Sequence, residues 1–133
     1  MTEPLRVVAA VLFDAQRRVL IAQRPPGKHM AGWWEFPGGK VGAGESAEQA
    51  LGRELAEELG IELQRCHSLL QLRHDYADRI VALEVFLVDE YRGEPCGREA
   101  QALKWVPPAQ LRCEELLLAD RPVVEALIAL AEG

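Results

Sequence analysis

Three glutamates in the middle of the chain, together with a neighbouring arginine, have the types and the spacing of a metal-binding site. The segment of residues 39–61, GKVGAGESAEQALGRELAEELGI, contains Arg53, Glu54, Glu57 and Glu58. In an α-helix, which turns by about 100° per residue, the three glutamates fall within an arc of roughly 100° on one side. Carboxylates crowded on one face repel each other, so the arrangement costs stability unless a cation lies among them. Because oxygen ligands favour hard ions, we expect Mg²⁺ here, with Mn²⁺ as an alternative.

The helix that must position these carboxylates has predicted ends. Ser46 followed three residues later by Gln49 is a capping-box pattern, which predicts that the helix begins near residue 46. Gly60 lies where helices commonly end. A glutamate-rich face that is simply solvated is the alternative interpretation. That alternative explains neither the glycines of the preceding loop nor Glu45. The helix face predicted to turn towards the core carries Leu51, Leu55 and Leu59.

Composition limits the classes of protein to which the chain can belong. A length of 133 residues with 49% hydrophobic content predicts one domain, residues 1–133, with a buried core. A net charge of −6 and a pI of about 5.1 argue against binding a nucleic-acid polymer through a broad basic face. A small anionic substrate would instead be met locally by a metal and a few cations. The oligomeric state stays open between monomer and homodimer.

The cysteines and the hydrophobic runs indicate a cellular compartment. The three cysteines, Cys66, Cys96 and Cys113, show neither a CxxC pair nor the spacing of a zinc site. An odd number of cysteines without a signal peptide predicts free thiols and a cytoplasmic protein. We expect no membrane span, because no apolar run approaches the length of about 20 residues that a spanning helix needs.

Apolar runs on both sides of the central helix predict an α/β protein. Residues 5–13, LRVVAAVLF, are typical of a strand buried on both faces, and residues 19–23 of a strand that returns after a turn at 14–17. We therefore expect these two strands to form a hairpin. The other predicted elements are strands at 61–63, 68–73, 79–88 and 101–106, loops at 74–78 and 89–98, a short helix at 109–112 and a long helix at 122–131.

Residues 39–61 also match the Nudix box, G-x5-E-x7-R-E-U-x-E-E-x-G-U with U aliphatic. Every fixed position is filled, by Gly39, Glu45, Arg53, Glu54, Leu55, Glu57, Glu58, Gly60 and Ile61. The chain thus resembles Nudix hydrolases. The segments EFPGGK at 35–40, GEPCGRE at 93–99 and ADRPV at 119–123 make it similar to the MutT type, without gaps from about residue 7 to residue 128. The resemblance implies the Nudix fold, an α/β/α sandwich in which a mixed sheet has the box helix on one side and the C-terminal helix on the other.

The resemblance implies an activity, the hydrolysis of a nucleoside triphosphate to a monophosphate and pyrophosphate. Glu54 would deprotonate or orient the attacking water. Arg53 would fix the glutamates by ion pairing, and Glu45 would tie the loop to the helix or join the outer metal shell. The implied metal ligands are the Gly38 carbonyl, Glu54, Glu57, Glu58 and Glu99, and the implied catalytic residues are Glu54, Arg53 and Glu45.

Five further residues are expected to contact the substrate. Lys40 would lie near the phosphates, and the other four would line the nucleotide pocket. The alternative for Arg24 and Arg79 is an ordinary arginine at the end of a strand, and the alternative for Tyr76 is an ordinary aromatic residue in a turn. Trp33 and Trp34 could stack on a base or pack in the core. The expected substrate-binding residues are Arg24, Lys40, Tyr76, Arg79 and Asp120.

Asp120 departs from the MutT pattern, which usually has asparagine here in enzymes that hydrolyse 8-oxo-dGTP. An amide can donate to O6 and accept from N7–H of 8-oxoguanine, whereas an ionised aspartate only accepts. Aspartate would therefore favour N–H donors such as those of guanine or the cytosine amino group. A structural alternative is that Asp120 supports the start of the last helix.

Three functions are compatible with these residues. The first is a MutT-like enzyme that removes oxidised purine triphosphates such as 8-oxo-dGTP before polymerases use them in replication. The second is the same chemistry on CTP or modified dCTP, because a branch of the family with that activity has an ADxP-like segment. The third is a Nudix domain that binds a nucleotide without hydrolysing it. The intact set of Arg53, Glu54, Glu57 and Glu58 argues against the third.

Overall fold

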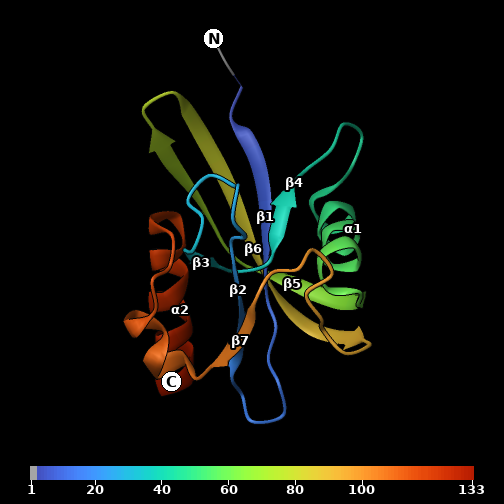
Figure 1. Cartoon of the computed structure of the whole chain (residues 1–133), viewed down its shortest axis with the longest axis vertical. Helices are drawn as coiled ribbons and strands as arrows, with labels where there is room; N and C mark the ends of the chain where they lie inside the picture. The colour runs from blue at the N-terminus through green and yellow to red at the C-terminus, as the bar shows by residue number, and fades with distance from the viewer. Residues whose placement is uncertain (1–2) are drawn as a thin grey trace.

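The strands form two sheets that lie between two helices. The computed structural model describes residues 3–133, and α1 and α2 lie on opposite sides of the strands (Figure 1). One sheet is mixed, in the order β4-β1-β6-β5, and the other is antiparallel, in the order β3-β2-β7. The predicted α/β class is therefore confirmed. In chain order the elements are β1 (Leu5–Val11), β2 (Val19–Gln23), β3 (Trp34–Glu35), β4 (Gly38–Lys40), α1 (Ala47–Leu59), β5 (Glu62–Tyr76), β6 (Arg79–Arg92), β7 (Leu103–Val106), the short 3-10 helices η1 (Pro108–Cys113) and η2 (Leu118–Asp120), and α2 (Arg121–Glu132).

Strand β1 is central and buried on both faces, as its apolar sequence predicts. It pairs in parallel with β6 and antiparallel with β4. Because side chains alternate along a strand, Ala9 and Val11 enter the core that includes α2, whereas Val8, Ala10 and Leu12 enter the core that includes α1. The strand therefore holds two separate hydrophobic cores together.

The predicted hairpin of the first two strands is only partly present. The chain does turn at residues 14–17, and Phe13 forms an isolated bridge with Val19. Beyond that bridge β1 and β2 separate into different sheets, and β2 pairs with β3 and β7 instead. The expectation of a full hairpin was wrong because β2 pairs with β3 and with the distant β7, and local spacing carries no information about that distant partner.

Strands β5 and β6 are much longer than predicted. They form one continuous hairpin with a turn at residues 77–78 only. Residues 74–76 of the predicted loop at 74–78 and residues 89–92 of the predicted loop at 89–98 therefore belong to strands. Strand β5 is at the edge of its sheet, and most of its side chains are polar and exposed. Three register shifts between residues 63 and 70 also interrupt its alternation. A bulged, exposed edge strand lacks the period-2 apolar pattern from which strands are predicted.

Helix α1 has both predicted ends. The Ser46 side chain accepts a hydrogen bond from the Gln49 backbone N–H at 3.1 Å, and the Gln49 side chain accepts one from the Ser46 N–H at 2.9 Å. Gly60 ends the helix in the left-handed conformation, with φ of 70°, which a residue without Cβ adopts at little cost. The capping box is therefore confirmed. It fixes the first residue of the helix and, with it, the positions of the glutamates along the helix.

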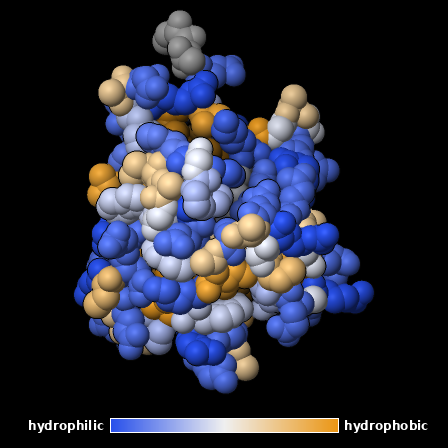
Figure 2. All heavy atoms as spheres, viewed as in Figure 1, coloured by the Kyte–Doolittle hydropathy of each residue, from blue (hydrophilic) through white to orange (hydrophobic). Residues whose placement is uncertain are grey.

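The surface is mainly hydrophilic in the orientation of Figure 2, with small hydrophobic patches between polar residues. Helix α2 buries Val123, Val124, Leu127 and Ile128 against the sheet. Within residues 3–133, no helix combines the length and the apolar character that crossing a membrane requires.

Candidate active site

A cleft of about 560 Å³ opens between β1, β4, the end of α1 and the segments at 24–30 and 117–120. It has an acidic end, formed by α1 and the loop before β7, and a second end beside η2. Eight of the residues predicted to form the site line this cleft: Arg24, Gly38, Lys40, Glu54, Glu58, Tyr76, Glu99 and Asp120.

Two glutamates of α1 share a hydrogen bond at the acidic end. The pKa of the Glu58 carboxyl is raised to about 9, chiefly by burial and also by the hydrogen bond with Glu54 and the negative charges of Glu54 and Glu99. Two carboxylates this close cannot both ionise without a compensating charge. A Cβ atom at Gly39 would lie 2.3 Å from Glu54 Cδ, so only glycine leaves room for this carboxylate against β4.

Arg53 connects the glycine-rich loop to the glutamates of the helix. Its Nε and Nη2 atoms bind the two carboxylate oxygens of Glu45 at 2.7 and 2.9 Å. Its Nη1 lies 2.9 Å from Glu54 Oε1, and its Nη2 donates to the Lys40 carbonyl at 3.0 Å. The hydrogen bonds from Arg53 and from the Gly42 N–H lower the pKa of Glu45 to about 2. This planar, five-donor guanidinium therefore fixes the direction of the Glu54 side chain.

Four residues predicted to belong to the site do not line the cleft: Glu45 and Arg53, whose contacts are given above, and Glu57 and Arg79. Glu57 is half-exposed and turns towards Arg53, with 3.4 Å between Glu57 Oε2 and Arg53 Nη1. Arg79 lines a separate groove beside Arg6 and the loop at 41–45, because it is at the turn of the β5–β6 hairpin. Among residues 3–133, no three His, Cys, Asp or Glu side chains are already gathered as a metal centre.

The acidic end nevertheless fits a hard divalent cation. The side chains of Glu54, Glu58 and Glu99 and the backbone of Gly38 offer only oxygen donors there. A cation held there would relieve the repulsion between the partly buried carboxylates of Glu54 and Glu58. Oxygen ligands and uncompensated negative charge are the two features expected of a site for such an ion.

The other end of the cleft contains a buried acid. Asp120 is 6% exposed, and it makes no side-chain hydrogen bond to the first turn of α2. Capping of that helix therefore does not explain its position. The pKa of Asp120 is raised to about 7, because burial and the charge of Glu35 outweigh the opposing effects of the Phe36 N–H and Arg24.

Glu35 is a site residue that the sequence interpretation missed, although it belongs to the EFPGGK segment. Burial raises the pKa of its carboxyl, which pairs with Arg24 Nη1 at 3.0 Å. Arg24 Nε donates to the His29 carbonyl at 2.6 Å. The Arg24 charge is therefore already compensated by Glu35, and the two side chains together line the second end of the cleft.

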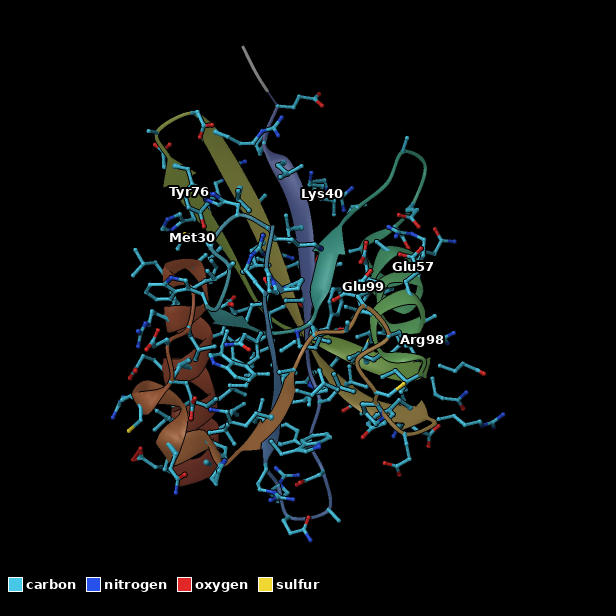
Figure 3. The ribbon with its side chains drawn as sticks, in the orientation of Figure 1. Met30, Lys40, Glu57, Tyr76, Arg98 and Glu99 are labelled. Atoms are coloured by element: carbon cyan, nitrogen blue, oxygen red, sulfur yellow. The ribbon has the colours of Figure 1, made fainter. Side chains whose placement is uncertain are left out.

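Exposed hydrophobic side chains surround this second end. Met30, Tyr76 and Leu118 line the cleft and are 39%, 42% and 68% exposed. Figure 3 shows Met30 and Tyr76 on the side of α2, whereas Glu57 and Glu99 lie on the side of α1. No sequence signal separated Leu118 from core residues. Neither predicted tryptophan lines the cleft; Trp34 packs against the core, with Lys104 Nζ 4.6 Å from its ring centre.

Comparison with known proteins identifies the family. The model of the NUDIX domain matches residues 3–127. The chain belongs to the Nudix family. This Nudix chain is 49% identical over 90 residues to an 8-oxo-dGTP diphosphatase of Proteus vulgaris, a match covering 68% of this chain and 80% of that protein. It is 40% identical over 126 residues to the CTP pyrophosphohydrolase of Escherichia coli strain K12, covering 95% and 93%.

A solved structure has the same fold. A structure from the study of MutT of Aliivibrio salmonicida and Vibrio cholerae superimposes with a TM-score of 0.84 at 38% identity, over 96% of this chain and 99% of that one. The Nudix fold inferred from the box is thus confirmed, and the chain is MutT-like.

Proposed function

We propose that this Nudix protein hydrolyses a nucleoside triphosphate to a nucleoside monophosphate and pyrophosphate. One observation carries the proposal: a single cleft has a pair of partly buried glutamates, Glu54 and Glu58, at one end and a buried acid with an apolar rim at the other. The first end suits metal-bound phosphates, and the second suits a base. The enzymes named 8-oxo-dGTP diphosphatase and CTP pyrophosphohydrolase, to which the chain is similar, support the same reaction.

The acidic end would hold Mg²⁺, or Mn²⁺ as the alternative. The proposed ligands are the Gly38 carbonyl, Glu54, Glu57, Glu58 and Glu99, with Glu57 held only by its 3.4 Å contact with Arg53 Nη1. When bound, the metal neutralises phosphate charge as it builds up in the transition state. The protein's own contribution is to keep these oxygens in place before the substrate arrives.

Glu54 is our proposed base, which orients or deprotonates the attacking water. Arg53 holds its Oε1 at 2.9 Å, and Arg53 is itself fixed by both oxygens of Glu45. A base acts only when its oxygen lies within hydrogen-bonding reach of the water, so this fixed direction matters more than a high pKa. Lys40, which lines the same part of the cleft, would contact the phosphates.

The Glu54→Gln variant tests the mechanism. We expect the fold and the unfolding free energy to be nearly unchanged, whereas turnover falls by at least about 100-fold, because an amide cannot accept the proton. The measurement is pyrophosphate release with Mg²⁺, beside urea denaturation of the same sample. Turnover close to that of the wild type would refute the assignment. Binding of nucleotide without turnover in the wild type would instead favour a sensor.

The base that the enzyme prefers is the second part of the proposal. We favour 8-oxo-dGTP, so that the enzyme would remove oxidised purine triphosphates before replication uses them. Asp120 makes CTP or modified dCTP the specific alternative, because a buried carboxylate accepts N–H donors and cannot donate when ionised. A panel of 8-oxo-dGTP, dGTP, dCTP and 5-methyl-dCTP, compared by kcat/KM, separates the two. A preference for either cytidine substrate over 8-oxo-dGTP would overturn our first choice.

The compartment and assembly belong to the same proposal. All three cysteines are free thiols, which supports the reducing cytoplasm, where the nucleotide pool lies. We propose that the active form is a monomer or a homodimer. Light scattering behind size-exclusion chromatography, run beside the activity assay, distinguishes them.

A further inference from the structure

The loop that carries Glu99 also closes the C-terminal end of α1. The last carbonyls of a helix have no partner within the helix. Here the Leu59 carbonyl accepts from the Cys96 N–H at 3.0 Å, and the Glu58 carbonyl accepts from the Arg98 N–H at 3.0 Å. Figure 3 shows Arg98 and Glu99 on this loop beside α1. The loop is therefore fastened to the helix that carries the other glutamates of the site.

The side chain of Gln101 links the two parts directly. Its Nε2 donates to the Glu58 carbonyl at 3.1 Å, and its Oε1 accepts from the Glu99 backbone N–H at 2.9 Å. The two contacts use the two different ends of one amide, so no residue with only a donor or only an acceptor could make both. One side chain thus sets the distance between the backbone of Glu99 and the backbone of Glu58.

The loop between these contacts has little freedom. A Cβ atom at Gly97 would lie 2.2 Å from the Gln101 carbonyl, so the chain passes itself closely at this glycine. Ala100 has φ of 63°, a conformation that costs a non-glycine residue energy and persists only where surrounding contacts impose it. The Ala100 N–H donates to the Gly97 carbonyl at 3.0 Å. The Gln101 amide supplies side-chain contacts that hold this tight turn against α1.

We propose that Gln101 is a positioning residue that places Glu99 next to Glu58 and thereby sets the affinity for the divalent metal. The inference rests on the proposed function, since it assigns the metal to the glutamates of the cleft. The alternative is that Gln101 only closes the end of the helix. The two differ in one respect: only a positioning residue acts on the metal through Glu99.

The test uses a double-mutant cycle with Mn²⁺ as the probe. We expect Gln101→Met, which keeps the length of the side chain and removes both hydrogen bonds, to weaken Mn²⁺ binding by about 10-fold, as loss of a residue that orients a ligand typically does. Glu99→Gln should weaken it as well. In the Glu99→Gln background, Gln101→Met should have no further effect, because the two changes remove one interaction. Binding is measured by electron paramagnetic resonance of free Mn²⁺.

A second readout does not depend on the metal or on activity. The Glu99 amide should exchange with solvent faster in Gln101→Met than in the wild type, measured by nuclear magnetic resonance without metal. The matched control is Gln71→Met, since Gln71 Nε2 binds Glu84 Oε2 at 3.1 Å on the sheet, outside the cleft. This control should change neither the exchange at Glu99 nor Mn²⁺ binding.

The outcomes separate this inference from the proposed function. If the wild type binds Mn²⁺ and hydrolyses triphosphates but Gln101→Met binds Mn²⁺ normally, the inference is wrong and the function stands. Additive effects of Gln101→Met and Glu99→Gln would equally overturn it, as would unchanged exchange at Glu99. If the wild type neither binds Mn²⁺ nor hydrolyses any triphosphate, the proposed function fails, and the role assigned to Gln101 fails with it.

Discussion

Replacing Gly39 by alanine is the most direct test of how the site holds its proposed base. The added Cβ would lie 2.3 Å from Glu54 Cδ and 2.5 Å from each carboxylate oxygen. Carbon atoms in contact are normally about 3.5 Å apart, so the carboxylate must move by roughly 1.2 Å. Gly39 does not have a positive φ, and the atoms that must move are the end of a flexible side chain. The protein should therefore still fold, but the Glu54 carboxylate cannot keep its present position.

The expected loss of activity follows from that displacement. A misplacement of about 1 Å in a catalytic group can reduce the rate by about 100-fold, which corresponds to about 2.7 kcal/mol of transition-state stabilisation. We expect Gly39→Ala to lose turnover by this factor while nucleotide still binds. The assay is pyrophosphate release with Mg²⁺ under saturating substrate, together with urea denaturation to measure the unfolding free energy.

Gly52→Ala is the matched control. Gly52 lies in α1 next to Arg53, and its added Cβ would meet only Leu63 at 3.9 Å, an ordinary contact. Alanine in the interior of a helix is favoured over glycine by about 0.5–1 kcal/mol, so this variant should be more stable and fully active. If Gly39→Ala kept near-normal turnover, the position of Glu54 would not control the reaction and our reasoning would be wrong. A Gly39→Ala protein that failed to fold would equally refute it.

Three further changes test separate parts of the structure. Gly38→Ala would place a Cβ 2.0 Å from the Val8 carbonyl oxygen and 2.7 Å from Ala9 Cα, so it should open the β1–β4 pairing and cost on the order of 3 kcal/mol or more in urea denaturation. Asp120 has its pKa raised from 3.8 to about 7, so the folded protein keeps a proton that the unfolded chain releases, and stability falls as the pH rises through that interval. Asp120→Asn should remove this dependence and gain, at pH 8, on the order of 4 kcal/mol at most, as denaturation curves between pH 4 and pH 8 would show. Arg53→Lys cannot bind both oxygens of Glu45 and Glu54 Oε1 together, so turnover should fall by about 10- to 100-fold while the helical content by circular dichroism stays the same.

The local features of the fold could be predicted from the sequence, whereas the pairing of its strands could not. Ser46, Gln49 and Gly60 act within a few residues, so their pattern located both ends of α1 correctly. The separation of β1 from β2 depends on β7, which lies far along the chain. The length of β5 was hidden because an exposed edge strand with register shifts has no regular apolar period.

In the candidate site, too, local features could be predicted from the sequence and contacts between distant segments could not. The spacing on one helix predicted Glu54, Glu57 and Glu58 for the metal site. Glu54 and Glu58 line the cleft, whereas Glu57 lies beside it, with its Oε2 3.4 Å from Arg53 Nη1. Contacts between distant segments, such as that of Gln101 with the end of α1, cannot be predicted from the local sequence. Leu118 is an ordinary apolar residue in the sequence, and only the fold shows that it is exposed beside Asp120.

The two cores on either side of β1 limit how this chain can change in length. Deleting one residue from the middle of β1 would send every following side chain of the strand to the opposite face, so that Val8 and Ala9 would exchange environments. Both cores would then be mispacked by a single event, and the pairing that holds Gly38 and Gly39 beside the cleft would shift with them. The hairpin turn at 77–78, which touches neither core, can gain residues without this penalty. Natural insertions and engineered loops should therefore be sought at that turn and not in the strand.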